Sequence, residues 1–226
     1  MSTFNLIVWV LFIAALIFLG YFFIKRIMQN KKAQKEAAES LAQKKEKYSY
    51  LREGALDDCP REDLSSAVLF HCMRKEDDDF EHYFDNMNNS ERVIYGIYQV
   101  SSSLSGSNPS LHSFFLSPAC KQFVPIVSDI FEEVGAHEIA DLMKAARRFA
   151  EIIENDEEDD ENDPDMGIYA RYNFSDFTNE FVTLVSTTNL NEKITKFILK
   201  HKSDFYDTDI PEDVENGDDE DERISD

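Results

Sequence analysis

The first apolar stretch of the chain is also its longest. From Leu6 to Ile24, nineteen consecutive positions carry no charged side chain. A helix of that length extends about 28 Å, and the hydrocarbon core of a bilayer is roughly 30 Å thick. A buried helix of a soluble protein is seldom apolar on every face, and a signal peptide has a shorter apolar core that follows positive charge. The pattern therefore predicts a transmembrane helix over residues 6–24, with residues 1–5 on the far side of the membrane.

The distribution of positive charge predicts the orientation of this span. Eight lysine and arginine residues lie between Lys25 and Lys47, and none precedes the span. Because such charge collects on the cytoplasmic side of a membrane, we expect an external N-terminus and a cytoplasmic domain at the inner membrane of the cell. The residues expected at the membrane interfaces are Trp9, Tyr21, Lys25 and Arg26.

Beyond the span, apolar positions recur at helical spacing and not in the alternation of strands. Residues 25–62 are rich in good helix formers and poor in apolar residues, which predicts a basic helical stalk and linker. Residues 63–206 contain successive amphipathic segments, typical of helices. The predicted fold class is therefore all-α: a transmembrane helix and a stalk, followed by an irregular bundle of about six helices. One apolar set at helical spacing, expected in the core, is Phe80, Tyr83, Phe84 and Met87.

Two stretches are too acidic to pack into a core. Residues 154–165 read ENDEEDDENDPD, and residues 207–226 have the same low-complexity character. Such composition buries too little apolar surface to offset the entropy of ordering the chain. We expect a flexible loop at 154–165 and a disordered tail at 207–226.

Net charge limits the classes of partner. Residues 1–50 carry a net charge of +5, whereas residues 51–226 carry −27. A strongly acidic domain repels nucleic acid, so direct binding of DNA or RNA is not expected. The same field attracts basic protein surfaces, so we expect a basic protein partner in addition to the membrane. A homodimer is left open.

The sequence contains no recognisable catalytic motif. It has no nucleophile elbow, phosphate-binding loop, HExxH zinc motif or dinucleotide-binding glycine pattern. Cys59, Cys72 and Cys120 are widely spaced and fit a reducing compartment without a zinc site. We therefore expect no catalytic residue, no metal and no cofactor. Two alternatives remain: a helical enzyme in which His112 or His201 serves a pocket, and a passive scaffold or cation-buffering acidic domain.

Three stretches carry a resemblance to a known family: Glu91–Ser117, Glu132–Ala146 and Phe197–Tyr206. Together they resemble the acidic DNA-mimic protein family and its C-terminal all-helical domain of otherwise unknown function, over roughly residues 63–206. Pro109 and Ser110 stand where that family favours two glycines. The residues that match the family's motifs, and that the resemblance implies to be structural, are Asn108, Leu111, His112, Phe114, Phe115, Gly135, Ala136, His201 and Phe205.

The resemblance implies a domain whose carboxylates imitate the phosphates of DNA and occupy the basic site of a DNA-binding protein. Imitation needs rigidly spaced charge, which helices provide and flexible runs do not. An ordinary solvated helix face is the alternative interpretation of the same acids. The candidate partner-binding residues are accordingly helix-borne: Asp129, Glu132, Glu133, Glu138 and Asp141.

Overall fold

The computed structural model describes residues 32, 34–105, 109–159, 174–208 and 210. All regular secondary structure in these ranges is helical, which confirms the all-α prediction. None of the helices in them is both long and apolar enough to cross a bilayer. The predicted span, Leu6–Ile24, and its interface residues Trp9, Tyr21, Lys25 and Arg26 lie outside the described residues.

The chain divides into two compact units, Met1–Lys47 and Tyr48–Asp226. In the first unit, residues 34–47 are helical and mostly exposed. Glu36 and Glu39 each pair with a lysine four residues earlier, at 3.6 and 3.5 Å. Exposed pairs of this kind add only a few tenths of a kcal/mol each to a helix.

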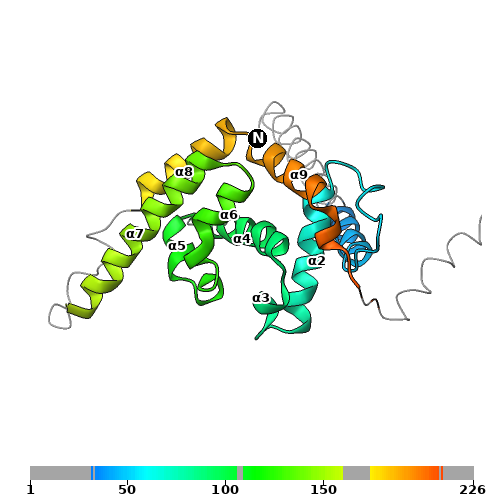
Figure 1. Ribbon diagram of the computed structural model, residues 1–226, viewed down its shortest axis with the longest axis horizontal. Coiled ribbons are helices and arrows are strands. Elements are labelled where there is room, and N and C mark those ends of the chain that lie inside the picture. The colour runs from blue at the N-terminus through cyan, green and yellow to red at the C-terminus, as the bar shows by residue number, and fades with distance from the viewer. Residues whose placement is uncertain (1–31, 33, 106–108, 160–173, 209, 211–226) are drawn as a thin grey trace, which may run out of the picture. The chain divides into compact units, whose positions relative to one another are not determined.

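The second unit contains eight α-helices in its described part (Figure 1), with short 3₁₀ turns at 118–120, 124–126 and 202–205. This is more than the six or so expected, and two of the eight are only four and six residues long. The segment from Ser117 to Gly135 contains two prolines and starts its regular helix only at Val127, since proline ends the α-helical hydrogen-bond pattern. The helices are α2 (Leu64–Asp78), α3 (Tyr83–Asn86), α4 (Asn89–Ser103), α5 (Leu111–Leu116), α6 (Val127–Glu133), α7 (His137–Asp159), α8 (Ser175–Thr187) and α9 (Leu190–Lys200).

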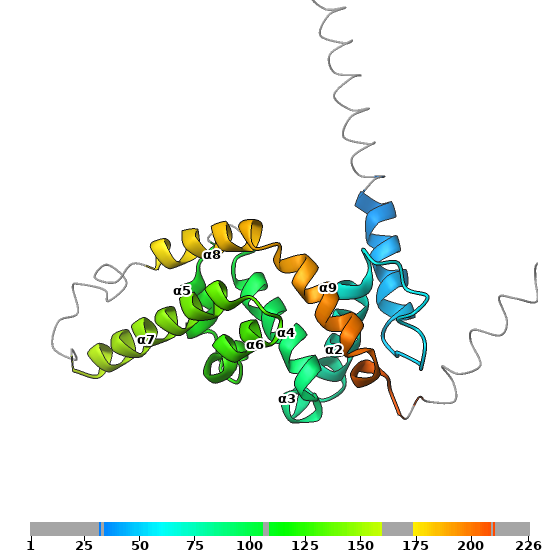
Figure 2. The ribbon, with the colours of Figure 1, turned by 45° about the horizontal axis from the view of Figure 1, so that its top comes forward.

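Helix α4 lies at the centre of this unit, between α2 on one side and α5 and α6 on the other (Figures 1 and 2). Its start is a capping box: the Asn88 side chain accepts the Glu91 N–H at 3.0 Å, and the Glu91 carboxylate accepts the Asn88 N–H at 2.9 Å. Two otherwise unpaired donors of the first turn are thereby satisfied. The five consecutive residues 93–97 are all buried, as expected of a helix covered on several faces.

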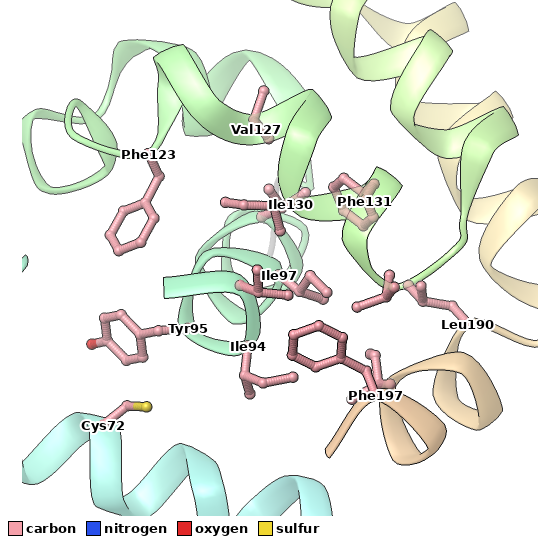
Figure 3. Packing of buried hydrophobic residues seen from close by; sticks show 14 of the residues in the cluster. Cys72, Ile94, Tyr95, Ile97, Phe123, Val127, Ile130, Phe131, Leu190 and Phe197 are labelled. Carbon is pink, nitrogen blue, oxygen red and sulfur yellow. The ribbon is translucent and has the colours of Figure 1, made fainter. Parts of the chain in front are cut away.

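The packing around α4 is shown in Figure 3. Ile97 of α4 lies between Ile130 and Phe131 of α6 and Phe197 of α9, while Tyr95 points toward Phe123. The close approach of α6 depends on Gly96. A Cβ atom at this position would lie 2.4 Å from Ile130 Cδ1 and 3.0 Å from Phe123 Cδ1.

The boundaries of the compact unit differ from those predicted. Tyr48, Leu51 and Leu56 belong to the hydrophobic core, so the domain begins at Tyr48 and not at residue 63. The segment around Leu51 is not helical, and its buried residues therefore have no periodicity for the sequence pattern to reveal. At the other end, Asp207 is hydrogen-bonded to the domain, one residue into the predicted tail.

Helix α7 continues to Asp159 and includes the first six residues of the predicted flexible loop. A helix is extended more easily than it is nucleated, and glutamate is a good helix former. Residues 160–165 of that loop and residues 211–226 of the predicted tail lie outside the described residues.

Candidate functional site

The five acids predicted to bind a partner lie on two consecutive, packed helices. Asp129, Glu132 and Glu133 are on α6, and Glu138 and Asp141 are on the first turns of α7. All five side chains are exposed. Residues three or four positions apart on a helix have Cβ atoms about 5–6 Å apart, so each helix presents a short row of carboxylates.

The turn between α6 and α7 fixes how the two rows are joined. Gly135 has φ +73°, a left-handed conformation that glycine adopts without strain. The N–H groups of Gly135 and Ala136 donate to Glu132 O and Phe131 O, both at 2.8 Å, which satisfies carbonyls at the end of α6. Lys193 of α9 donates to Gly135 O at 2.6 Å. The family-motif residues Gly135 and Ala136 thus set the geometry of the acidic surface without belonging to it.

Some of these acids are placed where they stabilise their helix, but others are not. Asp129 and Glu138 lie in the first turns of their helices, where negative charge is favourable. Glu132 pairs with His137. Glu133, by contrast, ends α6, where the helix dipole disfavours a carboxylate, and it lies four residues after Asp129, a like-charge spacing. Within the described part of the chain, Glu133, Glu138 and Asp141 form no ion pair.

A second acidic group, which the sequence analysis did not select, surrounds the end of α2. Asp77 and Asp78 occupy its last turn, followed by Asp79 and Glu81. Phe80, predicted to lie in the core, is 68% exposed among them. The core prediction was therefore wrong for Phe80, because α2 ends before this residue and the helical spacing with Tyr83 is interrupted.

The remaining family-motif residues have structural positions. Leu111, Phe114 and Phe205 are fully buried. His112 stacks on Phe174, with ring centroids 4.8 Å apart, and Phe115 packs against both Phe114 and Phe174.

His201 stacks on Phe197 at 4.5 Å and pairs with Asp204. Asn108 lies outside the described residues. The turn before α5 uses a serine cap in place of the family's glycines: Ser110 Oγ accepts the His112 N–H at 3.2 Å.

A buried group of charged side chains joins four distant parts of the chain, and no pattern in the sequence indicates it. We call it the C-terminal clasp; it consists of His71, Arg74, Glu91, Asp207 and the backbone of Leu51. His71 Nε2 lies 2.8 Å from Glu91 Oε1, and His71 Nδ1 lies 3.3 Å from Asp207 Oδ2. Arg74 donates to Asp207 Oδ1 at 2.8 Å, and the Leu51 N–H donates to Asp207 Oδ2 at 2.8 Å.

The clasp shifts the ionisation of its members. Burial disfavours the charged imidazole, but the carboxylates of Asp207 and Glu91 outweigh this and raise the pKa of His71. Burial likewise opposes the charge of Glu91, yet hydrogen bonds from His71 and Lys75 hold its pKa below the usual value. The pKa of Asp207 is also lowered against burial, by His71, the Leu51 N–H and Arg74.

This arrangement does not supply a general base. His71 is fully buried and both of its ring nitrogens face carboxylates, so no substrate atom can reach it. His82, His137 and His201 each pair with an acid close to them in sequence. No group of three metal-ligating side chains with suitable geometry occurs among the residues that the structure describes.

One family profile, that of the DMP19-like proteins, matches residues 85–201, just over half of the chain. The matched region contains α4 to α9 and excludes α2. DMP19 is a DNA-mimic family. Neither a curated protein nor a solved structure gives a significant match.

Proposed function

The chain belongs to the DMP19-like protein family, and on this premise we propose that its acidic domain binds the basic, DNA-contacting surface of a partner protein in place of DNA. The supporting observation is the coincidence of the family domain with a net charge of −27 over residues 51–226. A basic surface that evolved to bind phosphates is attracted to such a domain over long range, and attraction of this kind accelerates encounter.

Most of this charge is concentrated in two short segments. Residues 154–165 contain nine acids and no base, and residues 207–226 contain eleven acids and one base. Together they carry −19 of the −27. The remaining residues of the acidic domain carry −8, and α7 itself carries Lys144, Arg147 and Arg148 in its middle.

The end of α7 matches the charge density of DNA most closely. Five of the six residues from Glu154 to Asp159 are acidic, and all six belong to the helix. At about 1.5 Å per residue this is one charge per about 1.8 Å of helix axis. Duplex DNA carries one charge per about 1.7 Å. We therefore assign the main partner contact to the end of α7, with the α6–α7 acids as the rival surface.

Two variants with identical changes in composition separate these surfaces. One neutralises the end of α7 (E154Q, D156N, E157Q, E158Q, D159N), and the other neutralises the predicted acids (D129N, E132Q, E133Q, E138Q, D141N). Each removes three glutamates and two aspartates. A third variant, with the same composition change at scattered exposed positions, controls for net charge (E53Q, E81Q, E180Q, D85N, D176N).

The test captures partners on the full-length protein from a detergent extract and then measures the affinity of each variant for the captured protein. We expect the α7 variant to lose at least about tenfold in affinity, equivalent to about 1.4 kcal/mol, and the scattered control to stay within about twofold. Equal losses in all three variants would refute a defined binding surface. A captured protein that binds no DNA would refute mimicry.

We further propose that residues 6–24 anchor the protein in the inner membrane with the acidic domain in the cytoplasm. The uncharged run and the eight basic residues that follow it support this topology. Membrane fractions washed at high salt should retain the full chain, whereas a chain that starts at residue 25 should be released. Recovery of the full chain in the soluble fraction would overturn the anchor, as would cleavage of its C-terminus by protease added outside intact cells.

A further inference from the structure

The C-terminal clasp ties the family domain to parts of the chain that the family profile does not cover. Glu91 lies inside residues 85–201, whereas Leu51, His71 and Asp207 lie outside them. Leu51 and Asp207 are 156 residues apart and exchange two hydrogen bonds: the Leu51 N–H donates to Asp207 Oδ2, and the Asp207 N–H donates to Leu51 O, both at 2.8 Å. The first and last described segments of the compact unit therefore meet at one point.

The position of His71 between two carboxylates favours its protonated form. Nε2 is hydrogen-bonded to Glu91, whereas Nδ1 lies 3.3 Å from Asp207 Oδ2 without hydrogen-bond geometry. A neutral imidazole has one N–H and one lone pair. In the neutral form one of the two carboxylates would therefore face a lone pair inside the protein, where electrostatic interactions are screened much less than in water. The electrostatics of the site thus favour the imidazolium form.

We propose that the clasp is a proton-dependent latch, which holds Asp207 against Leu51 and α2 while His71 carries its proton and releases Asp207 when that proton is lost. Among the described residues, two carboxylates face His71: Glu91 from α4 and Asp207 from the segment after α9. Each is paired in turn with a base of α2, Lys75 with Glu91 and Arg74 with Asp207. Arg74 also pairs with Asp78 at 3.2 Å and lies over the Tyr50 ring at 4.1 Å.

The Asp207 contact is the one that opens. Glu91 is held independently of His71, by Lys75 at 2.8 and 2.9 Å and by the Asn88 N–H of the capping box. Asp207 also has bonds to Arg74 and to the Leu51 backbone, but it belongs to the end of the described chain, and its 3.3 Å approach to His71 Nδ1 is the longer of the two histidine contacts and lacks hydrogen-bond geometry. Loss of the proton therefore weakens the terminal segment first and leaves α4 capped.

Release is confined to the end of the compact unit. Phe205 stays fully buried and Ser90 Oγ still donates to Asp204 at 2.6 Å, so the preceding turn keeps its own contacts. Residues 208–226, which contain ten acids and one base, follow Asp207 directly. The latch thus controls whether the segment that precedes these residues is fixed to Leu51 and α2.

The pH window follows from the directions of the pKa shifts. His71, whose pKa is raised on folding, stabilises the latch fully below its unfolded value of about 6.5, and this contribution is lost as the pH rises through the folded pKa. Asp207 and Glu91, whose pKa values are lowered, contribute above their unfolded values of about 4 and are lost in acid. The latch is closed in mildly acidic solution and opens in alkali.

Hydrogen exchange of the full-length protein in detergent tests this directly. The Leu51 amide reports the contact, because it donates to Asp207. After correction for intrinsic exchange, its protection should fall about tenfold or more from pH 6 to pH 9. In His71→Gln, protection should be low and vary by less than about twofold over this range. The matched control is His201→Gln, which removes another histidine–aspartate pair and should retain the wild-type pH dependence.

Asp207→Asn provides a second test of the latch if His71→Gln does not fold. It should show the same low, pH-independent protection of Leu51, and in NMR titration the pKa of His71 should fall below its wild-type value. Constant protection of Leu51 in the wild type, or unchanged pH dependence in Asp207→Asn, would overturn the latch. None of these measurements involves a partner, so they succeed or fail independently of the proposed function.

Discussion

Gly96 lies on the face of α4 that α6 covers, and its replacement by alanine tests how closely these helices must pack. In an exposed helix, Gly→Ala stabilises by about 1 kcal/mol. Here the new Cβ would lie 2.4 Å from Ile130 Cδ1 and 3.0 Å from Phe123 Cδ1. Both neighbours are buried, so neither can move into solvent.

Overpacking of a well-filled core costs about 1–3 kcal/mol. The gain in helix propensity, about 1 kcal/mol, offsets part of this cost. Gly96→Ala should therefore be destabilising overall, by up to about 2 kcal/mol. Ile130→Val removes the Cδ1 atom that collides and alone should cost about 1 kcal/mol. In the double variant the shortest collision is absent, so the combined loss should be smaller than the sum of the single losses by about 1 kcal/mol or more.

Urea unfolding of the full-length protein in a mild detergent, followed by far-UV circular dichroism, measures all four free energies of this cycle. Gly96→Ala should lower the unfolding midpoint without changing the slope. The reasoning would be refuted if Gly96→Ala stabilised the protein, or if the two substitutions had additive effects within about 0.3 kcal/mol.

Three further predictions concern the start of α4 and the clasp. Asn88→Ala removes the capping box and should lower the free energy of unfolding by about 1 kcal/mol, whereas Asn89→Ala, at an exposed position in the same turn, should change it by less than about 0.5 kcal/mol. Glu91→Gln leaves Lys75 and His71 without their buried counter-charge. In urea titrations this variant should lower the free energy of unfolding by about 3 kcal/mol at pH 6 and by less at pH 9. Between about pH 5 and pH 3 the free energy of unfolding should fall, because Glu91 and Asp207 take up protons more readily in the unfolded chain. Asp207→Asn should make this fall shallower. An unchanged slope would contradict the lowered pKa of Asp207.

The helical core was predictable where a helix buries one regular stripe. Leu190, Ile194, Phe197 and Ile198 of α9 have the spacing of a helix face, and all four are buried. Leu51 and Leu56 are equally buried but lie outside any helix, so their contribution to the core has no periodic signature. The periodicity of apolar residues reports only local geometry, so it does not indicate which irregular segments pack into the core.

The same limit applies to the candidate sites. The exposed acids of α6 and α7 could be selected because helix position alone places them on the surface. The clasp could not, since it depends on Asp207 returning to His71 from 136 positions away. Phe80 shows the opposite error: its spacing from Tyr83 suggested a shared helix face, but α2 ends at Asp78 and the next helix starts only at Tyr83, so Phe80 lies in neither helix.

If the acidic domain occupies a DNA-binding surface, it must compete with DNA for its partner. Competition is measured by adding duplex DNA to a complex of the full-length protein with its captured partner. DNA should displace the protein, and the affinity of the complex should fall steeply between about 50 and 200 mM salt, as phosphate-like contacts require. A ternary complex that contains DNA, or an affinity that does not change with salt, would contradict the proposed function.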